Sequence, residues 1–113
     1  ILVIDSRTPN WVARDHIPGA VNLPWTKLNT AKGADPLSIG EIMEGEFGAN
    51  QFDGLWKFAK AKTLVMYCNG MWCGQSPANI KALLDFGYPA HKIKWYRGGM
   101  QNWANLGLTT VKP

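Results

Sequence analysis

The segment YCNGMWCGQSP holds the two cysteines of the chain, Cys68 and Cys73. Cys68 follows an apolar run, and a helical pattern begins near Ser76. The free N–H groups and the positive dipole end at the start of a helix favour a thiolate and bind anions. Gly70 and Gly74 allow the intervening backbone to curl around one centre. The pattern predicts a nucleophilic Cys68 with a lowered pKa, against the alternative of a buried cysteine at the end of a strand.

The elements around this segment are predicted from the apolar runs of the chain. Short apolar runs alternate with helical patterns, which is typical of βαβ units on a largely parallel sheet. The run TLVMY predicts a central strand that is buried on both faces. Ligands of such sheets bind beyond the carboxyl ends of the strands, which is where Cys68 falls. We expect strands at 2–5, 20–24, 63–67 and 92–96, and helices at 8–15, 35–48, 51–61, 76–88 and 98–107.

Two of the expected helices depend on particular residues. In QFDGLWKFAKA, apolar residues recur at the spacing of a helix, at Phe52, Leu55, Trp56 and Ala59. In SPANIKALLDFGY, Ser76 is the expected N-cap and Gly87 the expected terminator. The side chains expected to face inward from that second helix are Ile80, Leu83 and Leu84.

Length and composition limit the class of protein. A chain of 113 residues is expected to form one domain, 1–113. Its 46% of hydrophobic residues indicates a folded chain, and no run approaches the about 20 apolar residues of a membrane span. The net charge of +4 fits a small anionic substrate, and the scattered lysines argue against nucleic-acid binding. Because the chain opens on ILVID without a Met, we expect a truncated N-terminus; cytoplasm and periplasm both stay open as compartments.

Three separated segments resemble the rhodanese-like domain family. They are VIDSRTPNWVARDHIPGAVNLPW, with its Asp5-x-Arg7 and HIPGA turn, then YCNGMWCGQS, and finally WYRGGMQNWANLGL. The resemblance implies a three-layer α/β fold with a central, mainly parallel sheet and helices on both faces. It also implies a single-domain sulfurtransferase of the thiosulfate type without a metal or organic cofactor. In that activity Cys68 takes a sulfane sulfur from thiosulfate or a persulfide and passes it to a thiol, cyanide or protein acceptor.

The resemblance also implies the substrate-binding residues. The cradle of the persulfide would be Asn69, Gly70, Met71, Trp72, Cys73, Gly74 and Gln75, with Arg97 at the rim. The loop is about two residues longer than in the common sulfurtransferase type. It also contains no Arg or Lys, which argues against phosphatase or arsenate reductase chemistry, because a transferring phosphoryl group needs a cation. The alternative role of Arg97 is a salt bridge that stabilises a turn.

Other readings of the titratable residues are weaker. His16 is expected to make a structural hydrogen bond and His91 to be solvated, and the spacing of these histidines and the cysteines is unusual for zinc. Asp5 and Arg7 are expected to form an internal ion pair.

Two other functions stay open for the chain. One is thiol–disulfide redox chemistry between Cys68 and Cys73, and the other is a catalytically silent interaction module of the same fold. We expect the side chain of Cys73 at the rim of the loop, with the two Cα atoms near or beyond the limit for a disulfide.

Overall fold

The structure is a computed structural model that describes residues 1–52 and 55–112. Over these residues the main sheet has four strands in the order β2-β1-β5-β6, and all neighbouring strands are parallel. The strands are β1 (Leu2–Asp5), β2 (Val21–Asn22), β5 (Leu64–Tyr67) and β6 (Ile93–Trp95). The α-helices are α1 (Pro9–Arg14), α2 (Pro36–Gly45), α3 (Gln75–Asp85) and α4 (Gly99–Asn105). Short 3-10 helices cover Trp25–Lys27, Thr30–Lys32 and Ala90–Lys92. No helix within the described ranges is long and apolar enough to cross a membrane.

β5 is a central strand, as the run TLVMY predicts. It is hydrogen bonded to β1 along one edge and to β6 along the other. Leu64 and Met66 are fully buried on one face of the sheet, and Tyr67 is fully buried on the other. A strand that is covered on both faces carries apolar side chains at successive positions, which explains the continuous apolar run. Cys68 follows directly at the carboxyl end of this strand.

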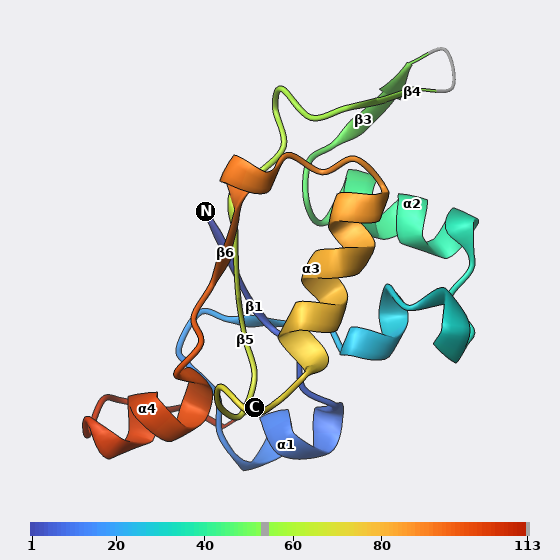
Figure 1. Cartoon of the computed structure of the whole chain (residues 1–113). Coiled ribbons are helices and arrows are strands. Elements are labelled where there is room, and N and C mark those ends of the chain that lie inside the picture. Colours follow the sequence, from blue (N-terminus) through green and yellow to red (C-terminus); the bar gives the residue numbers. More distant parts are fainter. Residues whose placement is uncertain (53–54, 113) are drawn as a thin grey trace.

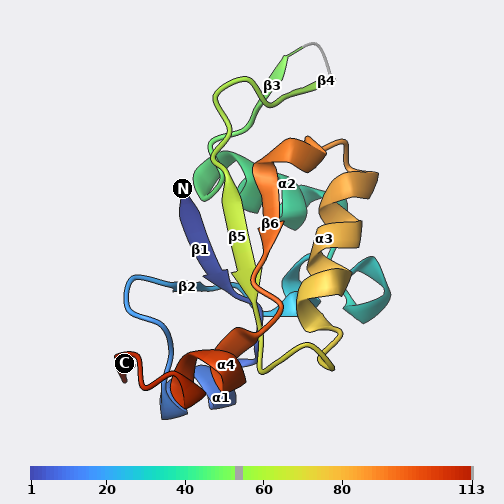
Figure 2. The same ribbon diagram turned by 60° about the vertical axis from the view of Figure 1, so that its left-hand side comes forward.

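Helices cover both faces of the sheet and confirm the predicted α/β architecture. Figures 1 and 2 show α2 and α3 together on one face. There Ile39 and Met43 of α2 and Leu83 of α3 belong to the same core cluster as Ile4 and Met66. The same two views place α1 and α4 beside each other at the carboxyl end of β5. A second core cluster joins α4 to the opposite face of the sheet through Ile17, Tyr67, Met100 and the partly buried Trp103.

The helix predicted over 51–61 is wrong for the described part of that range. β3 (Asn50–Phe52) and β4 (Leu55–Lys57) form an antiparallel pair that projects from the body of the molecule (Figure 1). Asp53 and Gly54 lie outside the described residues. Phe52 and Leu55 are therefore exposed instead of forming the inner face of a helix.

α3 begins and packs differently from the expectation in two details. Its first residue is Gln75 and its N-cap is Gly74, so Ser76 is not the cap but a buried residue of the first turn. Leu84 is 44% exposed, whereas Leu83 is fully buried. Gly87 has a φ of +95°, the left-handed conformation that ends helices, as predicted.

The adjacent leucines of α3 provide a matched test of this packing. We expect Leu83→Ala to lower the free energy of unfolding by about 2–5 kcal/mol, because a fully buried side chain leaves a cavity. Leu84→Ala makes the same chemical change at an exposed position and should change stability by less than about 1 kcal/mol. Urea unfolding measures both variants. Equal losses would contradict the assigned orientation of the helix.

Candidate active site

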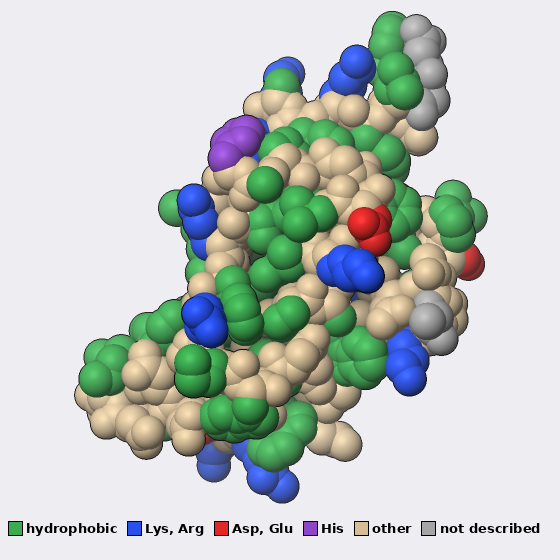
Figure 3. Space-filling view, in the orientation of Figure 1, with side chains coloured by type: hydrophobic (Ala, Val, Ile, Leu, Met, Phe, Trp, Pro, Cys, Tyr) green, Lys and Arg blue, Asp and Glu red, His purple; other side chains and the backbone are tan. Residues whose placement is uncertain are grey.

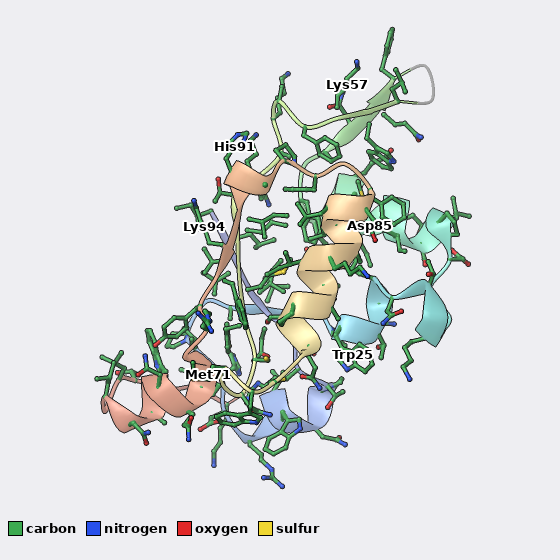
Figure 4. The ribbon with its side chains drawn as sticks, in the orientation of Figure 1. Trp25, Lys57, Met71, Asp85, His91 and Lys94 are labelled. Atoms are coloured by element: carbon green, nitrogen blue, oxygen red, sulfur yellow. The ribbon has the colours of Figure 1, made fainter. Side chains whose placement is uncertain are left out.

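Cys68 lies between the carboxyl end of β5 and the first turn of α3. Its side chain is only 1% exposed, whereas that of Cys73 is partly exposed, and both thiols are free. The loop between them folds back in a turn, in which the Cys73 N–H donates to the Gly70 carbonyl at 3.1 Å. In Figure 4, Met71 of this loop lies between α1 and α4, at the end of the molecule opposite to His91. The structure thus brings Cys68, Cys73 and the start of α3 together, as predicted.

The sulfur of Cys68 has both acceptors and donors around it. Its Sγ lies 3.6 Å from the carbonyl oxygen of Cys73 and 3.9 Å from that of Gly70. These oxygens accept from a thiol S–H. The backbone N–H and the hydroxyl of Ser76, in the first turn of α3, act in the opposite direction and lower the pKa of Cys68. The amide of Ser76 is one of those expected to act on the sulfur, whereas two carbonyls of the loop face the protonated thiol.

The predicted lowering of the Cys68 pKa is wrong for this free thiol. Burial raises the pKa of Cys68, and a side-chain interaction with Cys73 raises it further. Ser76 lowers it through its backbone N–H and its hydroxyl, but these effects do not outweigh burial. The sequence predicted the start of the helix, but the depth of the thiol and the orientation of Cys73 depend on the tertiary fold.

The backbone of the loop is held by α4. Met100 donates its N–H to the Cys68 carbonyl at 2.9 Å, and Gln101 donates to the Asn69 carbonyl at 2.8 Å. Gly99 has a φ of +58° and passes so close to the Cys68 carbonyl that a Cβ at this position would clash with it. Both features explain Gly99, the second glycine of the pair at the start of α4, because only glycine combines this conformation with this approach. The loop is therefore fixed from outside by a helix more than thirty residues further along the chain.

A buried polar network supports the loop from below. The predicted ion pair is confirmed: Arg7 contacts Asp5 at 2.7 Å, and both side chains are buried. Tyr67 donates its hydroxyl proton to Asp5 Oδ2 at 2.9 Å, and Arg7 donates to Asn69 Oδ1 at 3.3 Å. A further bond runs from Arg7 to the carbonyl of Asp15 at 2.6 Å. Arg7 thus positions the residue next to Cys68, a role that its place in the sequence did not indicate.

A second buried group lies under the start of α3. The hydroxyl of Ser76 donates to that of Ser6 at 3.0 Å, which links the helix to the end of β1. Asn79 is fully buried one turn later, and its side-chain amide has no hydrogen-bond partner within the described part of the chain. The sequence gives little signal for these residues, because a serine at this position fits an N-cap and no pattern distinguishes Asn79 from the rest of the helix.

The remaining predicted residues lie around the loop or away from it. Met71 and Trp72 are 62% and 64% exposed, and the Trp72 ring lies over Gly70. Figure 3 shows hydrophobic surface gathered at this end of the molecule. The guanidinium of Arg97 lies 5.1 Å from the centre of the Trp95 ring, a cation–π contact in place of the alternative salt bridge. Its role at the rim stays a prediction, as do the substrate-binding roles of the loop residues through Gln75.

The histidines do not join the cysteine loop. His16 places its Nδ1 3.4 Å from the carbonyl of Val12, and its backbone pairs with Val111, which agrees with a structural role. His91 lies at the other end of the molecule (Figure 4). Over residues 1–52 and 55–112, no group of three or more His, Cys, Asp or Glu is arranged to hold a metal ion.

Comparisons with known proteins agree with this geometry. The family model described as "Rhodanese-like domain" matches residues 1–106. The thiosulfate:glutathione sulfurtransferase of Saccharomyces cerevisiae is 27% identical over 108 residues, which are 95% of this chain and 67% of that protein.

Solved structures share the fold at lower identity. A Bacillus halodurans protein has a TM-score of 0.69 at 19% identity; the match covers 98% of this chain but only 63% of that one. A structure described as rhodanese with anions from E. coli has a TM-score of 0.61 at 22% identity, with 99% of this chain and 98% of that chain covered.

The pKa of Cys68 has a direct consequence for its reactivity. Only the thiolate is alkylated, so the rate at Cys68 should rise with pH through a midpoint above about 8.5, the ordinary value for a cysteine. Cys73→Ala should move this midpoint down, because it removes the interaction that helps to keep the proton on Cys68. Iodoacetamide labelling from about pH 6 to 10, followed by peptide mapping of Cys68, measures both values. A wild-type midpoint below the ordinary value would count against the described environment.

Proposed function

Because the chain belongs to the family of rhodanese-like domains, we propose that it is a sulfurtransferase that carries sulfur on Cys68. The observation that carries this proposal is the position of Cys68 at the end of the central strand, against the first turn of α3, where Ser76 favours its thiolate. The named activity of the yeast relative adds support for thiosulfate as the donor and a thiol as the acceptor.

The reaction has two displacement steps. In the first, the Cys68 thiolate attacks the sulfane sulfur of thiosulfate, the sulfur–sulfur bond breaks, and sulfite leaves with the electron pair. In the second, an acceptor thiolate or cyanide attacks the outer sulfur of the Cys68 persulfide, and the Cys68 thiolate leaves. Ser76 stabilises the anionic sulfur in both steps: its N–H lies at the start of α3, and its hydroxyl, which donates to Ser6 beside the neutral thiol, turns to the sulfur when the anion forms.

The surroundings of Cys68 fit sulfur transfer better than phosphoryl transfer. The loop from Cys68 to Gln75 has no Arg or Lys, and the nearby guanidinium of Arg7 is taken up by Asp5, Asn69 and a backbone carbonyl. A transferring phosphoryl group needs a free cation for its charged oxygens. A sulfane sulfur carries less charge, so helix N–H groups and a hydroxyl suffice.

The first test asks whether Cys68 takes up sulfur. Incubation with thiosulfate should load one sulfane sulfur on the wild-type protein and release one sulfite, and Cys68→Ser should do neither, because the serine hydroxyl does not attack sulfane sulfur. Sulfite release measures the uptake, and thiocyanate formation with cyanide measures the transfer. A folded wild-type protein that takes up no sulfur from thiosulfate, a polysulfide or a glutathione persulfide would favour the silent interaction module.

The second test concerns Ser76. Ser76→Ala keeps the backbone N–H but removes the hydroxyl, so we expect kcat/KM for sulfur transfer to fall by about 10-fold or more, the effect of one hydrogen bond to a charged group. The midpoint of the Cys68 alkylation profile should also move up, because the hydroxyl lowers the pKa of Cys68. Ser76→Cys or Ser76→Thr should restore part of the rate. A loss of activity without a shift of the alkylation midpoint would indicate a purely structural role through Ser6.

A further inference from the structure

Cys73 belongs to the part of the loop that folds back onto Cys68. The Cys73 carbonyl lies 3.6 Å from Cys68 Sγ, and the Cys73 side chain raises the pKa of Cys68. The turn closed by the Cys73 N–H and the Gly70 carbonyl directs this end of the loop back toward Cys68. Cys73, which is partly exposed as expected for the rim of the loop, is therefore a second nucleophile beside any sulfur that Cys68 carries.

The backbone next to Cys73 leaves room for movement. A disulfide requires the two sulfurs to approach to about 2.05 Å, so the thiols must come closer than a contact distance. Gly74 follows Cys73, is exposed, and has no atom within 4 Å of the position of a Cβ. Cys68, in contrast, is held by β5 on one side and by α4 on the other. The movement that brings the two sulfurs together is therefore made by Cys73 and Gly74.

We propose that Cys73 is a resolving thiol, which attacks the Cys68 persulfide at its inner sulfur, forms a Cys68–Cys73 disulfide and releases hydrosulfide. This inference rests on the proposed function of Cys68 as the sulfur carrier. The alternative point of attack is the outer sulfur, which would move the sulfur to Cys73 and expel the Cys68 thiolate. Weaker bases leave faster from a sulfur centre. Hydrosulfide is a weaker base than the thiolate of Cys68, whose pKa is raised by burial, so the inner sulfur is favoured.

The step balances in atoms and electrons. The Cys73 thiolate forms a bond to the Cys68 sulfur, the bond between the two persulfide sulfurs breaks, and the outer sulfur leaves with the electron pair as hydrosulfide. The sulfane sulfur is reduced to sulfide, and the two cysteines are oxidised to a disulfide. An external low-molecular-weight dithiol, or two monothiols, then reduces this disulfide by exchange and is itself oxidised. Sulfide and an oxidised thiol are therefore the products of a full cycle.

A single turnover without any acceptor tests the step. The reduced protein is incubated with thiosulfate, freed of small molecules, and followed by intact mass and by the sulfide released. We expect wild type to lose two hydrogens and to release about one sulfide per chain, whereas Cys73→Ser should keep one added sulfur and release none. Sulfur uptake by Cys73→Ser also shows that this variant retains the loop. The proposal is overturned if wild type keeps the added sulfur as long as Cys73→Ser does.

A second arm bypasses the donor, so that a failure of this inference is separated from a failure of the proposed function. Diamide should join Cys68 and Cys73 within one chain. Sulfide added to the oxidised protein then runs the step backward, and fragmentation of the peptide should locate the new persulfide on Cys68. If this occurs while no sulfane donor loads the protein, the pairing stands and the sulfurtransferase proposal fails. If diamide leaves both thiols free, or the persulfide forms mainly on Cys73, the inference is wrong.

Discussion

The buried ion pair of Asp5 and Arg7 is the interaction on which the site depends. Removing two charges from water is unfavourable unless their remaining hydrogen-bonding groups are also satisfied. Here Asp5 accepts from the Arg7 side chain and backbone and from the Tyr67 hydroxyl, while Arg7 also donates to Asp15 and Asn69. Burial opposes the charge of Arg7, yet its bonds to Asp5 outweigh this effect and its pKa is raised. The pair therefore links β1, β5 and the loop that begins at Cys68. Removing either charge would leave the other one buried and unpaired.

The surroundings of Cys68 hold its sulfur in a fixed position but do not make the thiol more acidic. A thiol at this depth keeps its proton, and two carbonyls accept it. Loss of that proton removes the donor and leaves two oxygens facing the sulfur anion. The hydrogen bonds from α4 hold the carbonyls of Cys68 and Asn69, and the bond from the Cys73 N–H to the Gly70 carbonyl closes the other half of the loop. The structure thus separates a half of the loop that α4 holds, which sets the sulfur in place, from a half that presents carbonyl oxygens to it.

The sequence predicted those parts of the molecule that depend on local pattern. The runs LVID and TLVMY contain strands because each is short and mainly apolar, and KIKWY contains one in which Ile93 and Trp95 alternate with lysines. Gly87 ends α3 because only glycine readily takes its conformation. The helix predicted over 51–61 is wrong because Phe52, Leu55 and Trp56 fit a helical spacing as well as they fit two short strands. The contact between Arg7 and Asn69 joins residues 62 positions apart, so no local pattern indicated it. For the same reason the sequence indicated both a helix start and a buried strand end at Cys68 but could not decide that burial has the larger effect on the pKa of the thiol.

The two hydrogen bonds from α4 also join the loop to a part of the chain that is synthesised later. The pairing of β1 with β5 already closes a loop of about sixty residues, and contacts of that separation form slowly because chain entropy must be lost first. Met100 and Gln101 then dock onto Cys68 and Asn69 from near the end of the chain. During synthesis on a ribosome, Cys68 emerges well before the helix that fixes its backbone. Until that helix has been made and has docked, the carbonyls of Cys68 and Asn69 lack the partners that hold them in the folded molecule.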